Sequence, residues 1–134
     1  MIQYDMQIIG LINVFEKNTG AKVKDCFNDG DVLVFVVQQK ELKKALENKG
    51  EKVRRLSAIT KKRIRIIEFN EDPVKFVLNL LYPLRPEVSL EEDHVLIKGK
   101  DAREKGQIFG REKTNFKHIQ SIVHKYFKIE LKVV

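Results

Sequence analysis

The sequence has no tryptophan, a single cysteine and only three prolines among 134 residues. Cys26 cannot form a disulfide within the chain, and this usage fits a reducing, cytoplasmic compartment. Because no histidine is positioned to activate it, we expect Cys26 to be a small buried residue of a strand. The first residues lack the charged segment and apolar run of a signal peptide, and runs such as 32–37 are too short to span a bilayer. We therefore expect a cytoplasmic protein with no membrane segment.

Groupings that carry catalysis or bind metal are also scarce. His118 and His124 are six residues apart on one predicted helix, a poor spacing for metal ligands, and His94 stands beside a turn. The acidic run 91–93 could do acid–base chemistry, but it is more typical of a solvated hairpin tip. No nucleophile, base and orienting group recur at a recognisable spacing. We expect no catalytic residue, no metal site, no cofactor and no enzymatic activity.

Positive charge is plentiful and lies in two blocks. The net charge is +7, and residues 40–65 hold 11 Lys/Arg against 3 Asp/Glu. Residues 98–128 hold 9 Lys/Arg against 3 Asp/Glu, so the rest of the chain is acidic. A charge that served solubility alone would be spread more evenly, whereas separated basic blocks favour a polyanionic partner. A thermophile surface rich in Lys and Glu is the alternative explanation.

The first half of the chain predicts one order of elements. Apolar residues at helical spacing, including Ile8, Ile12 and Phe15, indicate a helix that stops before Gly20. The turn signal at 28–31 separates two strands. The predicted elements are a helix over 2–17, strands over 23–27 and 32–37, helices from about 39 and from 51, and a strand over 63–69.

The second half predicts the same order again. Asp72 and Pro73 open a helix as N-cap and first helical residue, and Asp101 and Thr114 are predicted to cap two more. The predicted elements are a helix over 72–82, strands over 87–90 and 95–98, helices over 101–109 and from 114, and a strand over 129–134.

The two halves align at a fixed offset of 63 residues over most of their length. The run 32–34 matches 95–97, for example, and both basic blocks fall on the same elements. We therefore predict an α+β protein with two domains, residues 1–70 and 71–134, each helix-strand-strand-helix-helix-strand. Each copy is small enough for its own core to be marginal, and the link at about 70–72 is short. We expect the two copies to pack as one rigid unit.

Each basic block centres on a tight loop between two helices. The loops span 46–50 and 109–113, and the next helix begins at Glu51 or Thr114. This is where KH domains carry a G-x-x-G loop, in which small residues let the backbone approach nucleic-acid phosphates. The following helix points its free N–H groups at the same place. The element order resembles the type II KH arrangement. Phe109 and Phe116 could stack on bases, but their helical spacing leads us to expect that they pack in the core.

The chain further resembles the archaeal NusA-like transcription factors. The residues that carry this resemblance are Phe15-Glu16, Thr19 to Cys26, Val34 to Val37, Gly50 to Leu56, Glu71-Asp72-Pro73, Lys105-Gly106, Phe109-Gly110-Arg111, Asn115 and Phe127. The resemblance implies binding of single-stranded RNA and a role in transcription termination or elongation control. It also implies RNA polymerase or other transcription factors as further partners, and we expect a monomer.

The RNA-binding residues are predicted at the two loops and on the helices that follow them. They are Asn48, Lys49, Gly50, Lys52, Arg54, Arg55, Gly110, Arg111, Glu112, Lys113, Asn115 and Lys117. The family loop resembles G-K-G-G, whereas each loop here keeps one glycine and gains a carboxylate, Glu47 or Glu112. Two alternatives therefore stay open: a protein-interaction adaptor, and a ribosome-associated KH protein with weakened RNA binding.

Overall fold

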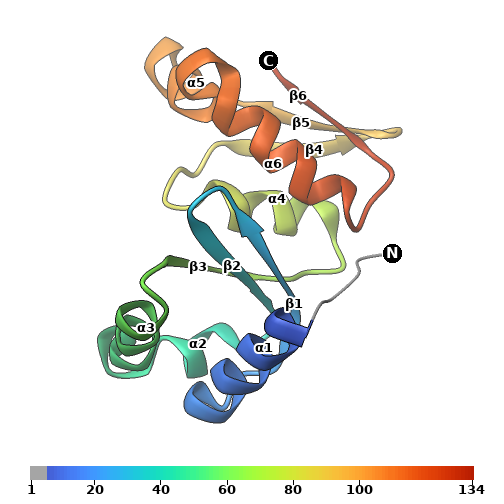
Figure 1. Cartoon of the computed structure of the whole chain (residues 1–134). Helices are drawn as coiled ribbons and strands as arrows, with labels where there is room; N and C mark the ends of the chain where they lie inside the picture. The colour runs from blue at the N-terminus through green and yellow to red at the C-terminus, as the bar shows by residue number, and fades with distance from the viewer. Residues whose placement is uncertain (1–5) are drawn as a thin grey trace. The chain divides into compact units, whose positions relative to one another are not determined.

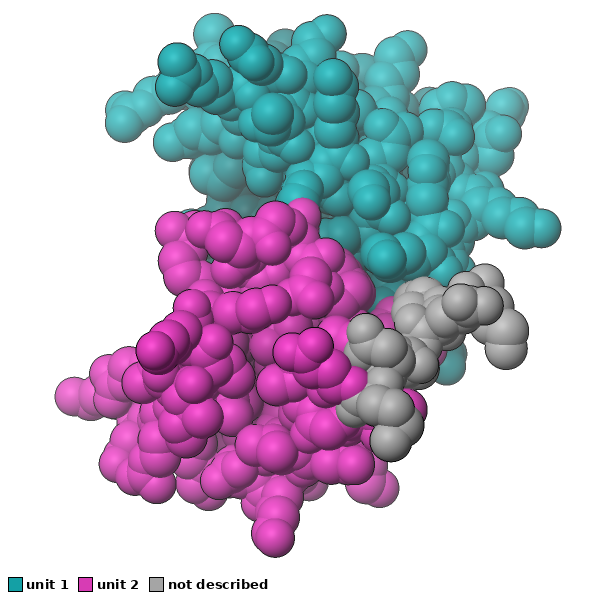
Figure 2. Space-filling model, viewed as in Figure 1, with its two compact units in different colours: residues 1, 70–134 teal, residues 2–69 magenta. Residues whose placement is uncertain are grey.

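The structure is a computed structural model that describes residues 6–134. Residues 2–5 of the first predicted helix lie outside this range. The chain divides into two compact units between Phe69 and Asn70, coloured magenta and teal in Figure 2. The residues before Asn70 are called the N-terminal unit below, and residues 70–134 the C-terminal unit. No helix within the described residues is long and apolar enough to cross a membrane.

The N-terminal unit has the predicted order of elements. They are α1 (Met6–Thr19), β1 (Val23–Asp29), β2 (Val32–Val37), α2 (Leu42–Ala45), α3 (Glu47–Thr60) and β3 (Arg63–Glu68) (Figure 1). The sheet order is β1-β2-β3, with β1 antiparallel and β3 parallel to the central β2. A hairpin turn joins β1 to β2, whereas the α2–α3 pair makes the crossover that a parallel connection requires.

The core of this unit lies between one face of β2 and helix α1. Leu33, Phe35 and Val37 alternate along β2 and are fully buried, and Phe35 stacks on Phe15 of α1 at 4.2 Å between ring centroids. Cys26 is buried in the same cluster, as predicted. Burial, helped by the negative charge of Asp25, raises the pKa of its thiol to about 12.

The stretch from Thr19 to Cys26, which contributes most to the predicted family resemblance, forms the corner between α1 and β1. Gly20 ends the helix at φ 74°, and the Thr19 hydroxyl donates to the Phe15 carbonyl. The N–H of Val23 donates to Glu16 Oε2, and the N–H of Lys22 donates to Glu41 Oε1, each at 2.9 Å. These side chains satisfy backbone groups at the start of β1, so this stretch has an architectural role.

The C-terminal unit repeats the order with its own lengths. Its elements are α4 (Pro73–Leu81), β4 (Glu87–Glu91), β5 (His94–Lys98), α5 (Ala102–Phe109), the short 3₁₀ turn η1 (Arg111–Lys113), α6 (Thr114–His124) and β6 (Glu130–Val133). The sheet order is β4-β5-β6, again with one antiparallel and one parallel pair. The predicted α+β class is thus confirmed, with a three-stranded sheet in each unit.

Two of the predicted helix caps are confirmed. Asp72 Oδ1 accepts the N–H of Val74, and Asp101 Oδ1 accepts the N–H of Glu104, each at 2.9 Å. The helix that Asp72 opens carries Phe76 into the core of the unit. The ring of Phe76 meets Tyr126 edge-on at 5.6 Å between centroids. Local capping and apolar spacing therefore place α4 and α5 as expected.

The predicted cap at Thr114 is wrong. Lys113, in the left-handed region at φ 61°, holds the N-cap position of α6. Thr114 is already helical, and its hydroxyl donates to the Arg111 carbonyl at 2.6 Å instead of accepting from the helix. A hydroxyl in the first turn has this nearby carbonyl as a competing partner, which the sequence pattern does not reveal.

The helix predicted from about residue 39 is shorter than expected. It forms a single turn, Leu42–Ala45, because Lys40 adopts a left-handed conformation with φ 71°. The Lys40 N–H donates to Glu68 Oε1 at the end of β3. The two repeats also differ after their last helices, where residues 61–62 lead into β3 but residues 125–129 lead into β6.

Candidate functional site

The loop between α2 and α3 reverses the backbone through three successive left-handed residues. Asn48, Lys49 and Gly50 have φ values of 54°, 58° and 73°, so the regular part of α3 begins only at Glu51. The Gly50 N–H donates to the Leu46 carbonyl at 3.1 Å and closes the turn. Asn tolerates this conformation, and glycine adopts it without a steric penalty. The remaining strain falls on Lys49.

This loop exposes polar side chains beside a helix N-terminus. Asn48 and Lys49 are exposed, whereas Gly50 is buried beneath them. The first-turn N–H groups of α3 follow directly, and the dipole of the helix makes this end attractive to anions. Lys49 adds a full positive charge, while Glu47 on the other side of the loop opposes it. The balance favours an anion held by Lys49 and the backbone together.

A groove runs from this loop along α2. Its floor is aliphatic, formed by Leu42 and by Leu46, whose side chain is 46% exposed. The remaining lining residues are Lys40, Lys43, Lys44, Glu47 and Glu68. The groove thus combines an apolar surface with a rim of lysines. It lies next to the loop at which the sequence predicts RNA binding.

One of these lysines is already paired. Lys44 Nζ lies 3.1 Å from Glu41 Oε2. The Lys22 N–H, together with the ammonium of Lys44, holds the pKa of Glu41 below its usual range. Lys40 and Lys43 are exposed on the same rim. We therefore expect these two lysines to supply most of the positive charge of the groove.

The loop between α5 and α6 reaches a similar reversal by another route. Gly110 has φ 69° and ψ 178°, a region that only glycine occupies readily, and Glu112 and Lys113 are left-handed. A Cβ built on Gly110 would lie 2.6 Å from Cβ of Asn115. Gly110 is therefore required both by its backbone angles and by the closeness of α6.

Asn115 locks this second loop. Its Nδ2 donates to the Ile108 carbonyl at 3.0 Å, at the C-terminal end of α5. This carbonyl belongs to the last turn of a helix and has no partner within it. The predicted contact of Asn115 with RNA stays a prediction, but its amide already bonds to the backbone. No sequence pattern predicts this contact, because it depends on the way α6 folds back.

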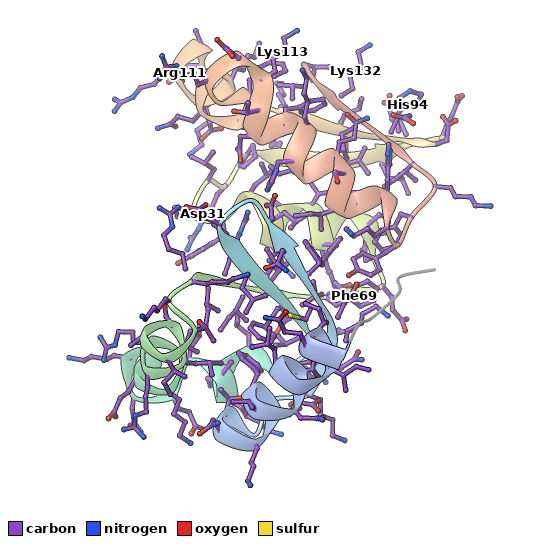
Figure 3. All side chains as sticks on the ribbon, viewed as in Figure 1. Asp31, Phe69, His94, Arg111, Lys113 and Lys132 are labelled. Atoms are coloured by element: carbon purple, nitrogen blue, oxygen red, sulfur yellow. The ribbon has the colours of Figure 1, made fainter. Side chains whose placement is uncertain are left out.

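Two cations project from the second loop (Figure 3). Arg111 and Lys113 are exposed, and Lys113 Nζ lies 5.7 Å from the centroid of the Phe109 ring. Phe109 and Phe116 contact each other at 5.5 Å and are half-buried. The two rings contact each other, but neither is fully buried, so the predicted packing in the core is confirmed only in part.

The other predicted site residues do not gather at the loops. Arg54 and Lys117 are exposed on α3 and α6. Lys52 and Arg55 instead line a separate hollow between α1 and α3, with Asn18. The structure thus brings Asn48, Lys49 and Gly50 together in one loop, and Gly110 to Lys113 in the other. It places Lys52 and Arg55 away from the α2 groove.

The histidines have local partners. His94 Nδ1 lies 2.8 Å from Asp93 Oδ1, and His124 Nε2 lies 2.9 Å from the Ile129 carbonyl. Within residues 6–134, no group of three or more His, Cys, Asp or Glu side chains could hold a metal ion. The geometry therefore directs attention to the two basic loops.

The fold and the two loops define an α+β protein of two similar units, each with a left-handed turn that carries an exposed cation. No protein-family model matches the chain. A Methanococcus vannielii protein named "Probable transcription termination protein NusA" is 35% identical over 86 residues, which cover 64% of this chain and 50% of that relative. This chain therefore matches only half the length of that protein.

Other relatives match over more of their length. A Thermoplasma acidophilum protein of the same name is 24% identical over 132 residues, which cover 96% of this chain and 92% of the relative. The crystal structure of a protein named APE1850 superposes with a TM-score of 0.77 at 23% identity, covering 98% of this chain and all of that one. The resemblance predicted from the sequence is confirmed: the chain is similar to several archaeal proteins named as probable NusA.

Proposed function

We propose that this chain is a single-stranded RNA-binding factor in transcription termination or elongation control. In this proposal the two units are tandem type II KH domains, and the chain acts by binding rather than catalysis. The observation that carries it is the paired left-handed loop with a cation, set before a helix N-terminus in both units. The printed names of the relatives supply the transcription context.

In the N-terminal unit, the loop would bind the phosphate and the α2 groove would bind the bases. A phosphate would lie against Lys49 and the first N–H groups of α3. Unpaired bases would lie along the aliphatic floor made by Leu42 and Leu46. A duplex keeps its bases stacked inside and cannot present them to such a floor. The arrangement therefore selects for single strands.

In the C-terminal unit, Arg111 would be the main phosphate contact. Arginine binds phosphate through two parallel N–H donors, so it tolerates the nearby carboxylate of Glu112 better than a point charge does. Lys113 adds a second cation at the helix start. We propose that both units contact one RNA strand, in the cytoplasm, with the transcription machinery as the partner that gives the binding its effect.

The proposal predicts tighter binding to single-stranded RNA than to duplex RNA or duplex DNA. Affinity should fall steeply with salt, because each Lys or Arg that neutralises a phosphate releases a counterion. Fluorescence anisotropy with a labelled 12-nucleotide RNA, repeated at several salt concentrations, measures both effects. For four phosphate contacts we expect a slope of about −3 in log K against log salt, from about −0.7 per contact on single strands.

Two controls separate this site from general attraction to polyanions. The same RNA annealed to its complement should bind more weakly at every salt concentration. Heparin is a polyanion without bases, so it should compete for the protein only through its charge. Equal affinity for single-stranded and duplex RNA would contradict the proposal.

A further inference from the structure

Ile59 is the most exposed large hydrophobic side chain in the described part of the chain, at 71%. It lies on α3, one residue before the helix ends at Thr60. A single exposed isoleucine is ordinary, so its significance depends on the residues that surround it. Ile59 borders a hollow that lies between α1 and α3.

This hollow, called the α1–α3 groove below, is a shallow surface depression of about 20 Å³ that combines an apolar floor with cations. Leu56 is buried at 3% exposure and forms the floor, and Ile59 stands at the rim. Lys52 and Arg55 are the charged lining residues, and Asn18 of α1 completes the set. Lys52, Arg55 and Ile59 follow one another at helical spacing, so they share one face of α3.

The electrostatics of the α1–α3 groove favour an acidic occupant. No carboxylate lines it. Glu51 lies outside the lining and pairs with Arg55 at 3.3 Å, with both side chains more than half exposed. Exposed pairs of this kind contribute little stability, so Arg55 is able to exchange Glu51 for an incoming carboxylate. The groove therefore offers two cations along the face of α3 that leads to the apolar anchor point at Ile59.

The same features favour a polypeptide over RNA. Within the lining there is no aromatic ring on which a base stacks, and the rim is occupied by a branched alkyl side chain. A bare phosphate backbone gains nothing from Ile59. An amphipathic protein segment satisfies both parts, because its apolar residue covers Ile59 while its carboxylates pair with Lys52 and Arg55.

We propose that the α1–α3 groove is a docking site for an acidic protein segment with an aliphatic anchor. The site is separate from the loop and the α2 groove, and the proposal does not depend on RNA binding. It also accounts for two cations, Lys52 and Arg55, that the sequence assigned to the RNA site. The chain would then hold a protein partner on one face of α3 while its loops remain available.

The test titrates the full chain, labelled with ¹⁵N, with a defined probe. The probe is a 12-residue helical peptide of Glu and Leu, with Leu at positions 1, 4, 5, 8 and 12, and the matched control replaces every Glu by Gln. We expect amide shifts to concentrate at Asn18, Lys52, Arg55, Leu56 and Ile59 with the Glu peptide only. Absence of binding at millimolar peptide, or equal binding of the Gln peptide, would overturn the proposal.

Variants then separate this groove from the RNA site. Ile59→Ser should weaken peptide binding by about tenfold, as for loss of an apolar anchor, and leave RNA affinity unchanged. Lys52→Glu with Arg55→Glu should abolish peptide binding. Lys61→Glu reverses a charge on an exposed residue beyond the end of α3 and outside the groove, and should have little effect. Weakened RNA binding by Ile59→Ser, or RNA-induced shifts centred on Ile59, would make the groove an RNA surface instead.

Discussion

At the scale of single residues, the two loop glycines have unequal roles. Gly50 is left-handed at φ 73°, and a Cβ added there would only touch Leu46 Cδ2 at 4.0 Å. Gly110 combines φ 69° and ψ 178° with a 2.6 Å clash against Asn115. Position 50 requires only a left-handed backbone. Position 110 requires an unusual backbone and also a residue without a Cβ atom.

We therefore predict that Gly110→Ala destabilises the protein more than Gly50→Ala does. The left-handed angle alone should cost Gly50→Ala about 1–2 kcal/mol. Strain and overpacking together should cost Gly110→Ala roughly 2–5 kcal/mol. Chemical denaturation of both variants gives the two free energies of unfolding. Asn115→Gly removes the Cβ clash but also the bond to the Ile108 carbonyl, so Gly110→Ala should cost less when it is introduced into Asn115→Gly than into the parent. Equal losses for the two single variants would show that the close packing at Asn115 is unimportant.

Cys26 gives a second prediction at this scale. Burial holds its thiol protonated to a pKa of about 12, above its usual value near 9. At pH 8 a thiol reagent should therefore react at the rate at which the surrounding structure opens, and quickly in denaturant. The unfolded chain loses this proton first, so the contribution to stability is complete below pH 9 and is lost as the pH rises from 9 towards 12.

Labelling with an aromatic disulfide, followed by absorbance, measures the reaction. Cys26→Ser at the same position is the control for reaction elsewhere, and should show none. Fast labelling of the folded protein at pH 8 would contradict the buried, protonated thiol. A free energy of unfolding that stays flat from pH 9 to pH 11 in the parent, relative to Cys26→Ser, would do the same.

At the scale of elements, the loops are the predicted contact with phosphate. Lys49→Asp and Arg111→Asp each remove a positive charge and add a negative one before a helix start. Both side chains are exposed, so stability should change by less than about 0.5 kcal/mol. We expect each substitution to weaken RNA binding by about 1–3 kcal/mol, and the double variant to lose most of it.

The matched control for these substitutions is Lys17→Asp, an equal charge change on exposed α1 away from either loop. It should shift affinity only through net charge. Circular dichroism and thermal melts show whether each variant is folded. Unchanged RNA affinity in a folded double variant would place the site elsewhere and favour a protein-interaction adaptor.

The positions of many helices and strands follow from local sequence signals. Asp72 with Pro73 and Asp101 open their helices where predicted, because a capping carboxylate acts on N–H groups two or three residues away. The β2 and β5 runs have their expected positions because strand formation follows alternation and apolar content. Residues that interact with near neighbours along the chain are therefore predictable.

The remaining features depend on groups that are distant in sequence. Glu41 accepts from Lys22, nineteen residues away, and Lys40 is bonded to Glu68. Asn115 reaches back to Ile108 only because η1 turns the chain by a left-handed step. The separation of Lys52 and Arg55 from the α2 groove likewise depends on where α1 packs. No local pattern contains these contacts.

At the scale of the whole molecule, the connection between the two units is short. Only residues 69–72 separate β3 from α4, and the Asp72 N–H is bonded to Asn70 Oδ1 at 2.8 Å. Each unit has fewer than about 70 residues, a size at which one core alone is marginal. We predict one cooperative unfolding transition for the full chain, and lower stability for residues 1–70 or 71–134 expressed alone.

Differential scanning calorimetry tests this directly, because one transition requires equal calorimetric and van't Hoff enthalpies. The isolated halves should melt at lower temperature than the whole chain. Two resolved transitions, or different rotational correlation times for the two units by NMR relaxation, would show that they are independent.

The packing of Tyr126 against Phe76 also gives the C-terminal unit an intrinsic spectroscopic probe of its folding. With no tryptophan, ultraviolet emission comes from Tyr4, Tyr82 and Tyr126 alone. Tyr82 is 66% exposed, whereas Tyr126 meets Phe76 edge-on. Changing Tyr4 and Tyr82 to Phe would leave one tyrosine, Tyr126, which is half-buried in the C-terminal unit. Its near-ultraviolet dichroism would follow that half alone, without any attached dye. A tryptophan introduced at Phe15, stacked on Phe35, would emit at longer wavelength and follow the other half in the same cuvette.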